Sequence, residues 1–436
     1  MLDLADLGQD SAAVEELAAR LPGHGARVAI VAPNEPVLRT GLLAAWRAGA
    51  VPVPLSARLR EYDLGRSLAD ADPALVLSVA EHRGYSFADF ARGSELPWLV
   101  LGQDGIGQAA EDTEPCDPDV GAILYTSGTT GEPKGALVTR AALADQAEVL
   151  AGVLELSEDD VIALPVPASH AFGLAALLAG LHAGARVQML EPGLALDGID
   201  PETTIVHGSP TLFAGLLRAL PPRLRGGFVA GAVCPAELLG RLDDAGARIL
   251  NLFGMTELGA AASCRPDDPP EVRHGSVGRP LPGFEFRVEG EEIQVRGPGV
   301  TPGYFRKPEL TAEAFDGDWF RTGDLGSIDE DGNVHISGRA KEVAHVGGFN
   351  VFPAEVEGCL LTHPDVRQAA VVAVPNERMG EALKAFVVTE ADLAPADLLH
   401  FARERIAGYK LPYEIEIVPE LPLLASGKPD RAALHA

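Results

Sequence analysis

The chain has 436 residues, which is too long for one ordinary domain and predicts two or three packed units. Its net charge of −28 at pH 7 argues against a nucleic-acid partner, because such proteins need a basic face to displace counterions. The four cysteines stand far apart and show no metal-ligand spacing, which argues against a disulfide framework or a structural zinc site.

No targeting or membrane segment is expected. The first ten residues, MLDLADLGQD, are acidic and carry no apolar run of the kind found in signal peptides. No stretch reaches the about 20 uninterrupted apolar residues that a membrane helix needs. The sequence therefore predicts a cytoplasmic protein that does not span a membrane.

Strand and helix patterns alternate along the first part of the chain. Apolar runs of strand length alternate with segments of helical periodicity, in the order 27–33, 36–48, 50–55, 62–70 and 74–80. A second alternation begins near residue 160 and continues to about residue 254. This rhythm is typical of a parallel sheet covered by helices. The predicted fold class is therefore α/β, with a large N-terminal domain.

The character of the sequence changes twice further on. Residues 284–297 (FEFRVEGEEIQVRG) alternate with period two, which predicts an antiparallel hairpin within a β-rich subdomain at about residues 275–338. Beyond residues 339–341 lie about 95 residues of mixed helix and strand patterns, enough for a small domain. We expect an N-terminal domain of residues 1–338 and a C-terminal α+β domain of residues 339–436.

The segment Thr126–Gly135 (TSGTTGEPKG) directly follows a predicted strand and has the composition of an anion-binding loop. Its glycines allow backbone N–H groups to approach an anion, its hydroxyls add donors, and Lys134 adds a positive charge. The spacing differs from the common nucleotide loop GxxxxGK[ST]. The segment by itself predicts phosphate binding.

Three further segments carry weaker signals. The stretch Phe253–Glu257 (FGMTE) ends a predicted strand and offers an aromatic face, a hydroxyl and a carboxylate that suits Mg²⁺. Asp324 lies between glycine turns, where a carboxylate can accept the hydroxyls of a ribose. Lys428 follows a glycine near the C-terminus, a position at which a lysine is usually just solubilising.

Taken in order, these segments resemble the AMP-forming adenylating superfamily, which contains acyl-CoA and aryl-CoA synthetases, adenylation domains of peptide synthetases and beetle luciferase. The matching motifs are TSGTTGEPKG, FGMTE, FRTGDL with its following GR, KEVAHVGGFNVFPAEVE and the closing SGK. The resemblance runs from Arg27 to the C-terminus, and the tail is most similar to the acyl-CoA synthetase branch.

The resemblance implies a reaction in two halves. A carboxylate attacks the α-phosphorus of ATP to give an acyl-adenylate and pyrophosphate, and a thiol then displaces AMP. The implied cofactors are ATP, Mg²⁺ and CoA, or a carrier-protein phosphopantetheine in place of CoA. The implied partners are a small carboxylic acid and, in the second case, an acyl carrier protein.

The resemblance also implies roles for individual residues. Thr126 and Glu257 would place Mg²⁺, Asp324 and Arg339 would bind the ribose, and Lys428 would reach both the carboxylate and the α-phosphate. The implied catalytic residues are Lys428, Thr256, Glu257 and His170. The implied nucleotide-binding residues are Thr126, Ser127, Gly128, Thr129, Thr130, Gly131, Lys134, Gly231, Ala232, Phe253, Gly254, Met255, Thr256, Asp324, Arg339 and Lys428.

Relatives in this superfamily use two orientations of a mobile C-terminal domain. By the match, Lys341 falls at the hinge, and Gly347 and Gly348 fall on the loop that lines the thiol tunnel. Pocket positions match His170, His207 and Ser209. A core histidine bonded to the backbone is the alternative interpretation of His170.

The sequence departs from the family pattern at several points. Phe253 replaces a common tyrosine, Arg140 stands where a histidine often follows the phosphate loop, and the segment before the first strand is short. The AGAVCP stretch is one residue shorter than its usual counterpart, which affects the expected adenine contacts of Gly231 and Ala232.

Four functions are compatible with these motifs. The first is a ligase that makes an acyl-CoA or aryl-CoA thioester. The second is a stand-alone enzyme that loads a carrier protein, and the third transfers the acyl group to an amine or another small nucleophile. The fourth is a nucleotide-binding protein without activity, which the joint presence of Lys134, Glu257, Asp324, Arg339 and Lys428 disfavours.

Overall fold

The structure is a computed structural model. It describes Leu4, Leu7 and residues 11–102, 114–126, 132–191, 198–376, 378–424 and 428–434. The chain forms two compact units, each built from several segments. The first unit comprises residues 1–192, 254–261 and 297–316, and the second comprises residues 193–253, 262–296 and 317–436.

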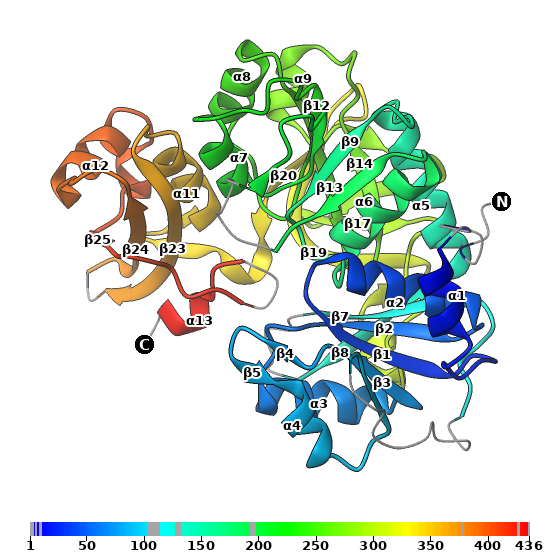
Figure 1. Ribbon diagram of the computed structural model, residues 1–436. Coiled ribbons are helices and arrows are strands. Elements are labelled where there is room, and N and C mark those ends of the chain that lie inside the picture. The colour runs from blue at the N-terminus through cyan, green and yellow to red at the C-terminus, as the bar shows by residue number, and fades with distance from the viewer. Residues whose placement is uncertain are drawn as a thin grey trace. The chain divides into compact units, whose positions relative to one another are not determined.

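The first unit contains a parallel four-stranded sheet with the order β2-β1-β3-β6 (Figure 1). Its strands and the helices around it are α1 (Ala12–Ala18), β1 (Arg27–Ala32), α2 (Pro36–Arg47), β2 (Val51–Ser56), α3 (Glu61–Ala71), β3 (Leu75–Ser78), α4 (Phe87–Arg92) and β6 (Trp98–Val100). The predicted parallel sheet is confirmed. A short hairpin, β4 (Glu81–His82) with β5 (Tyr85–Ser86), precedes α4.

Successive side chains of β1 point to opposite faces of the sheet, and apolar residues cover both faces. Val28 and Ile30 pack in one apolar cluster with α1 and α2, whereas Ala29 and Val31 pack in another with α3 and α4. All of these residues are fully buried in β1. A run of apolar residues without alternation is what a strand buried on both faces requires.

The first unit also contains the antiparallel pair β7 (Val120–Thr126) and β8 (Lys134–Thr139), followed by α5 (Arg140–Val153). The parallel pair β9 (Val161–Leu164) and β10 (Arg186–Met189) flanks α6 (Ala171–His182), which is apolar and buried over most of its length. The remaining elements are α10 (Pro308–Glu313) and β18 (Phe315–Asp316). Helices α5 and α6 pack against each other.

The second unit begins with further parallel strands, β11 (Ile205–Val206), β12 (Gly226–Val229) and β13 (Arg248–Met255). Helices α7 (Pro210–Leu216) and α8 (Ala236–Asp244) connect them, and α9 (Pro270–Gly275) packs on α8. Strand β14 (Gly259–Ser263) pairs with β15 (Arg279–Pro280) in antiparallel fashion.

The predicted antiparallel hairpin is confirmed as β16 (Glu285–Glu289) and β17 (Glu292–Arg296). Strand β17 pairs with β19 (Trp319–Ile328), and β19 pairs with β20 (Val334–Arg339). The short 3₁₀ helix η3 (Ala340–Glu342) follows β20 directly. This sheet therefore precedes the last segment of the chain, residues 340–436.

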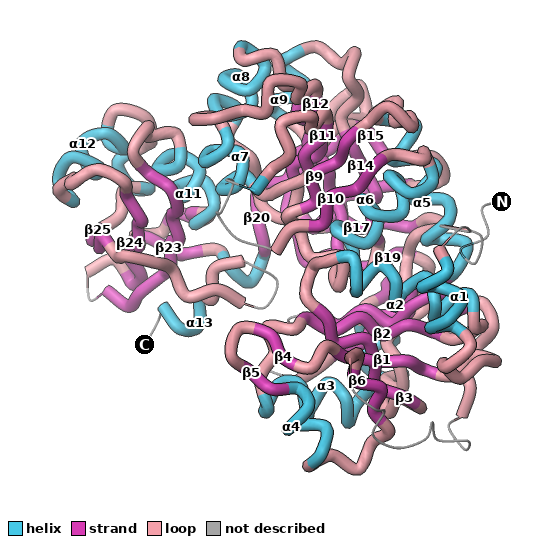
Figure 2. Tube along the Cα trace, in the orientation of Figure 1, coloured by secondary structure: helices cyan, strands magenta, loops and turns pink. Residues whose placement is uncertain are grey.

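The last segment contains a mixed sheet of β21 (Ala344–Val346), β22 (Phe349–Val351), β23 (Val366–Asn376), β24 (Gly380–Thr389) and β25 (Glu414–Ile417). Figure 2 shows α11 (Pro353–Leu361) and α12 (Pro395–Arg403) beside its strands. Val371 and Val387 pack towards these helices, whereas Ala370 and Val372 pack towards Leu421 in the tail. The remaining elements are η4 (Gly408–Lys410) and α13 (Arg431–Leu434).

No helix within the described part of the chain is both long enough and apolar enough to cross a membrane.

Candidate active site

The predicted phosphate loop connects β7 to β8. Thr126 ends β7 and lies opposite Lys134, the first residue of β8, so the antiparallel pairing fixes both ends of the loop. The side chain of Lys134 is half-buried. Ser127, Gly128, Thr129, Thr130 and Gly131, together with the side chain of Thr126, lie outside the described residues.

A tight turn between β13 and β14 carries Met255, Thr256 and Glu257. A Cβ atom on Gly254 would lie 2.0 Å from the carbonyl oxygen of Gly259, so only glycine fits where the two strands approach. Buried Gln146 of α5 accepts a hydrogen bond from Ala260 N–H at 3.2 Å. The turn is therefore held by helix α5 as well as by its own strands.

Glu257 is only 7% exposed, and its carboxylate has a defined partner. The hydroxyl of Tyr304 donates to Glu257 Oε1 at 2.8 Å, and Thr301 N–H donates to the Glu257 carbonyl at 2.7 Å. Burial and the neighbouring carboxylate raise the pKa of Tyr304 well above its usual value. The Tyr304 hydroxyl therefore keeps its proton, and remains a hydrogen-bond donor, over the whole physiological pH range.

The same segment that holds Glu257 also runs along β8. Tyr304 forms an isolated antiparallel bridge with Ala136, and Phe305 N–H donates to the Gly135 carbonyl at 2.8 Å. Glu257 is thus tied through Tyr304 to the strand that begins with Lys134. No local sequence pattern points to Tyr304, because only the fold brings residue 304 next to residue 257.

Asp324 and Arg339 face each other across β19 and β20. They are register partners, and Arg339 Nε lies 2.8 Å from Asp324 Oδ1. Asp324 is buried, its N–H donates to Thr322 Oγ1 at 3.0 Å, and Arg339 Nη1 donates to the Thr322 carbonyl at 3.0 Å. The predicted ribose residues therefore form one ion pair, in which the carboxylate is buried and the guanidinium is exposed.

Lys428 lies at the base of a small hairpin formed by the tail. Leu423 and Pro429 make an antiparallel bridge, and Leu424 N–H donates to the Lys428 carbonyl at 2.8 Å. A Cβ atom on Gly231 would lie 3.5 Å from Lys428 Cε and 3.8 Å from Lys428 Nζ. The fold of the second unit thus brings the tail lysine beside the loop that follows β12.

The environment of Lys428 disfavours its charged form. The residue as a whole is exposed, and a Cβ atom on Gly231 would lie 3.8 Å from its Nζ atom. Desolvation and the nearby Arg339 guanidinium lower the pKa of Lys428, while Glu342 and Asp324 oppose the shift. An anion placed beside Lys428 would favour its charged form.

The predicted adenine residues differ in exposure. Gly231 and Ala232 are exposed, and Gly231 has a φ of +88°, which favours glycine. Phe253 is buried and packs edge-to-face against Phe286, with ring centroids 6.0 Å apart. Val233, the next residue of the exposed loop, is also exposed.

The three predicted pocket residues lie in different environments. His170 is half-buried and is the N-cap residue of α6. Ser209 caps α7 and accepts a hydrogen bond from Leu212 N–H at 3.3 Å. His207 is buried, stacks on Phe228 and accepts from Phe228 N–H at 3.3 Å, and burial lowers its pKa to about 3. His207 is therefore neutral at physiological pH.

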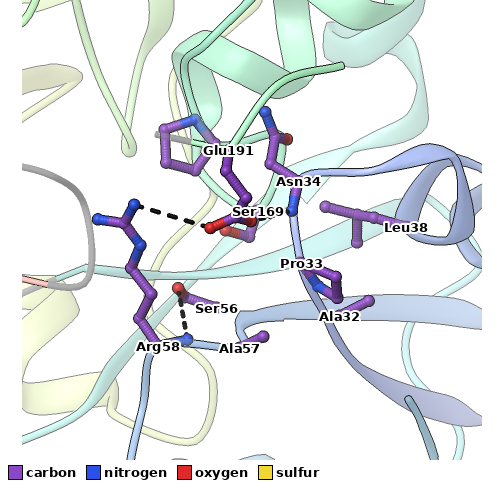
Figure 3. A pocket seen from close by; sticks show the side chains of 10 residues that line it. Ala32, Pro33, Asn34, Leu38, Ser56, Ala57, Arg58, Ser169 and Glu191 are labelled. Atoms are coloured by element: carbon purple, nitrogen blue, oxygen red, sulfur yellow. Dashed lines mark hydrogen bonds and ion pairs between the residues drawn. The ribbon is translucent and has the colours of Figure 1, made fainter. Parts of the chain in front are cut away.

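A small pocket in the first unit is lined in part by Ser169, the residue before His170 (Figure 3). Asn34 N–H donates to Glu191 Oε1 at 2.9 Å, and Arg58 lies 3.7 Å from Glu191 Oε2. The pocket is lined by Ala32, Pro33, Asn34, Leu38, Ser56, Ala57, Arg58, Pro167, Ser169 and Glu191. No predicted site residue lines it.

The predicted hinge and tunnel residues lie on the surface of the last segment. Lys341 is exposed within η3. Gly347 and Gly348 form the turn between β21 and β22, with φ values of +58° and +87°, and a Cβ atom on either would have no neighbour within 4 Å. Two consecutive positive φ angles require glycine or asparagine, which explains this pair structurally.

Comparisons with known proteins identify the family. Residues 9–305 match the family model of the AMP-binding enzyme, and residues 355–428 match that of the AMP-binding enzyme C-terminal domain. A feruloyl-CoA synthase from Amycolatopsis sp is 35% identical over 435 residues, covering 93% of this chain and 87% of that protein. A 2-succinylbenzoate–CoA ligase from Bacillus cereus (strain AH820) is 31% identical, with the same coverage.

A solved structure agrees with these matches. The crystal structure of ATP-bound MatB from Rhodopseudomonas palustris superposes with a TM-score of 0.79 at 31% identity, covering 99% of this chain and 92% of that one. The chain therefore belongs to the AMP-binding enzyme family, in its acyl-CoA synthetase branch. It is an AMP-forming carboxylate–CoA ligase, and its use of ATP and CoA follows from that membership.

Proposed function

We propose that the chain joins an aromatic carboxylic acid to the thiol of CoA, with MgATP as the energy source. The observation that carries this proposal is the position of Lys428 beside Gly231, near Arg339 and Asp324. The aromatic class is suggested by the relatives, since one is a feruloyl-CoA synthase and another a 2-succinylbenzoate–CoA ligase.

The residues of the first unit suit a magnesium ion that arrives with ATP. Tyr304 occupies Oε1 of Glu257, and among the described residues no hydrogen bond is made to Oε2. The described part of the chain contains no cluster of three or more potential metal-ligating side chains. Mg²⁺ is usually held by one or two carboxylates together with substrate phosphates, and Glu257 would be that carboxylate. The bound ion would neutralise phosphate charge.

In the first half-reaction, an oxygen of the substrate carboxylate forms a bond to the α-phosphorus and pyrophosphate leaves. The Asp324–Arg339 pair would hold the ribose, and Lys134 would face the leaving phosphates. Lys428 would donate to the attacking carboxylate and to an α-phosphate oxygen, offsetting the charge that builds up there. Such positioning and charge stabilisation account for most of the catalysis in phosphoryl-type transfers.

In the second half-reaction, the thiol sulfur forms a bond to the acyl carbon and AMP leaves. We place the moving module at residues 339–436, with Lys341 at its hinge. Beside the Gly347–Gly348 turn, Phe349 and Tyr409 form an exposed stacked pair with ring centroids 4.4 Å apart and an interplanar angle of 18°. Exposed aromatic faces of this kind suit the base of a nucleotide, which CoA carries and a carrier protein does not.

A carrier protein is the alternative acceptor. Carrier proteins are often acidic, and this chain has a net charge of −28, so the two surfaces would repel each other unless a local basic patch lay at the contact. An amine is a further alternative acceptor. The exposed aromatic pair favours CoA over both.

Replacement of Tyr304 by phenylalanine tests the assignment of Glu257. We expect the affinity of the enzyme for Mg²⁺ in the presence of ATP to fall about tenfold or more, because residues that orient a metal ligand contribute that much. Mn²⁺ binding followed by electron paramagnetic resonance would measure this affinity. Tyr85→Phe, whose ring packs on Phe87, is the matched control and should bind like wild type. Equal affinity in the two variants would contradict the assignment.

A substrate panel tests the proposed reaction. We expect acid-dependent release of pyrophosphate with aryl acids and little with short aliphatic acids or malonate. Addition of CoA should yield a thioester and AMP in equal amounts, as mass spectrometry and chromatography would show. Product formed only with a carrier protein or with amines would refute the CoA proposal, and pyrophosphate release only with aliphatic acids would refute the substrate class.

Replacement of Gly348 by tryptophan tests the thiol path. A Cβ atom at this position would have no neighbour within 4 Å, and the tryptophan ring would project where the thiol arm is expected, so thioester formation should fall while pyrophosphate release persists. Gly348→Asn is the control, because asparagine tolerates a positive φ and adds little bulk. A Gly348→Trp variant with the ligase rate of the Asn variant would contradict the tunnel assignment.

A further inference from the structure

Helix α11 carries a buried carboxylate, that of Glu357, which is bonded to strand β23. Glu357 is 9% exposed, and its Oε1 atom accepts a hydrogen bond from Val371 N–H of β23 at 2.8 Å. Arg431 Nη2 contacts both oxygens of this carboxylate, at 2.7 Å to Oε1 and 2.9 Å to Oε2. Both oxygens of the buried carboxylate are thus bonded, which a buried charge requires.

Arg431 belongs to the same short tail as Lys428. It begins α13, three residues after the lysine. Between them, Asp430 N–H donates to the Pro422 carbonyl at 2.8 Å, and its side chain accepts from Ala432 N–H at 3.1 Å. The hairpin and the start of α13 therefore form one hydrogen-bonded piece, which Arg431 ties to helix α11.

Arg431 also lies near the predicted hinge. Its Nη1 atom is 3.8 Å from Glu342 Oε2, and Glu342 follows Lys341 in η3. Glu342 is among the charges that act on Lys428. Arg431 therefore links three parts of the second unit: the tail, α11 and the segment that leads out of β20.

From these contacts we propose that Glu357 and Arg431 are positioning residues for the first half-reaction, because their buried ion pair holds the Lys428 hairpin where the lysine meets the carboxylate and the α-phosphate. This inference rests on the adenylating role proposed for Lys428. In this role Arg431 does not contact the substrate. The second half-reaction, in which Lys428 is not required, should depend much less on the pair.

The chemistry of the pair explains why neither partner is easily replaced. A guanidinium can contact both oxygens of one carboxylate, whereas a lysine ammonium is a point charge and loses this geometry. Burial raises the pKa of Glu357, and Arg431 opposes that rise. Loss of the arginine would leave a buried carboxylate without its counter-ion and release the tail from α11.

The test compares the two half-reactions in Arg431→Gln, Arg431→Lys, Glu357→Gln and the double variant Glu357→Gln/Arg431→Gln. Acid-dependent pyrophosphate release measures the first half, and thioester formation from synthetic acyl-adenylate and CoA measures the second. We expect Arg431→Gln to lower kcat of the first half about a hundredfold, as a displacement of about 1 Å can, with an unchanged KM for ATP. Arg431→Lys should fall between this variant and wild type.

The double variant should be no slower than Arg431→Gln, because the two residues act as one pair. Lys384→Gln, which removes a surface ion pair to Glu414 and Glu416 in the same segment, should leave both halves unchanged. Thermal unfolding of every variant reports whether the segment remains folded. An equal fall in both half-reactions, or no fall in the first, would overturn the positioning role.

Lys428→Ala separates failure of this inference from failure of the proposed function. If that variant releases pyrophosphate normally, the role of the lysine is wrong and the inference falls with it. If Lys428→Ala abolishes the release while Arg431→Gln and Glu357→Gln both retain it, only the positioning role is overturned. If Arg431→Gln does not fold, Arg431→Lys and Glu357→Gln give the same comparison of the two halves.

Discussion

Two anions meet in the first half-reaction, and a carboxylate approaches the α-phosphorus of ATP only where positive charge offsets their repulsion. The constraint is acute in a chain with 63 acidic and 35 basic residues. Lys134 at the start of β8, Arg339 and Lys428 are the cations that we propose for this role. Desolvation lowers the pKa of Lys428, and an anion beside the lysine would oppose that shift.

The side chains that we propose for the site are each held by a partner within the same unit. Tyr304 holds Glu257, and the strand β8 holds Tyr304. The Thr322 hydroxyl accepts from Asp324 N–H, and the cross-strand pairing places Asp324 opposite Arg339. Glu357 and Arg431 do the same for the tail that carries Lys428. In each case a polar or charged side chain is attached to a strand or helix of its own unit.

Local patterns in the sequence predicted much of this fold. The apolar runs at residues 27–33, 50–55 and 74–80 became the parallel strands β1, β2 and β3, because strands buried on both faces need continuous apolar side chains. Helix α11 begins at Pro353, because proline fits the first turn of a helix. The hairpin of β16 and β17 followed from its period of two.

The contacts that orient the site could not be predicted in this way. Tyr304 and Glu257 are 47 positions apart, and Glu357 and Arg431 are 74 apart, so only the tertiary fold brings them together. His207 illustrates the same limit, since its burial against Phe228 and its neutral state follow from packing rather than from neighbouring residues. The motifs supplied the proposed site residues, whereas the side chains that contact them were found only in the structure.

The central claim is that the carboxylate attacks the α-phosphorus of ATP, and an isotope experiment tests it most directly. An aryl acid labelled with ¹⁸O in both carboxylate oxygens is incubated with the enzyme, ATP, Mg²⁺ and CoA, and the products are analysed by mass spectrometry. The account predicts one ¹⁸O atom in each AMP formed and none in pyrophosphate. Unlabelled AMP, or label in inorganic phosphate, would contradict it.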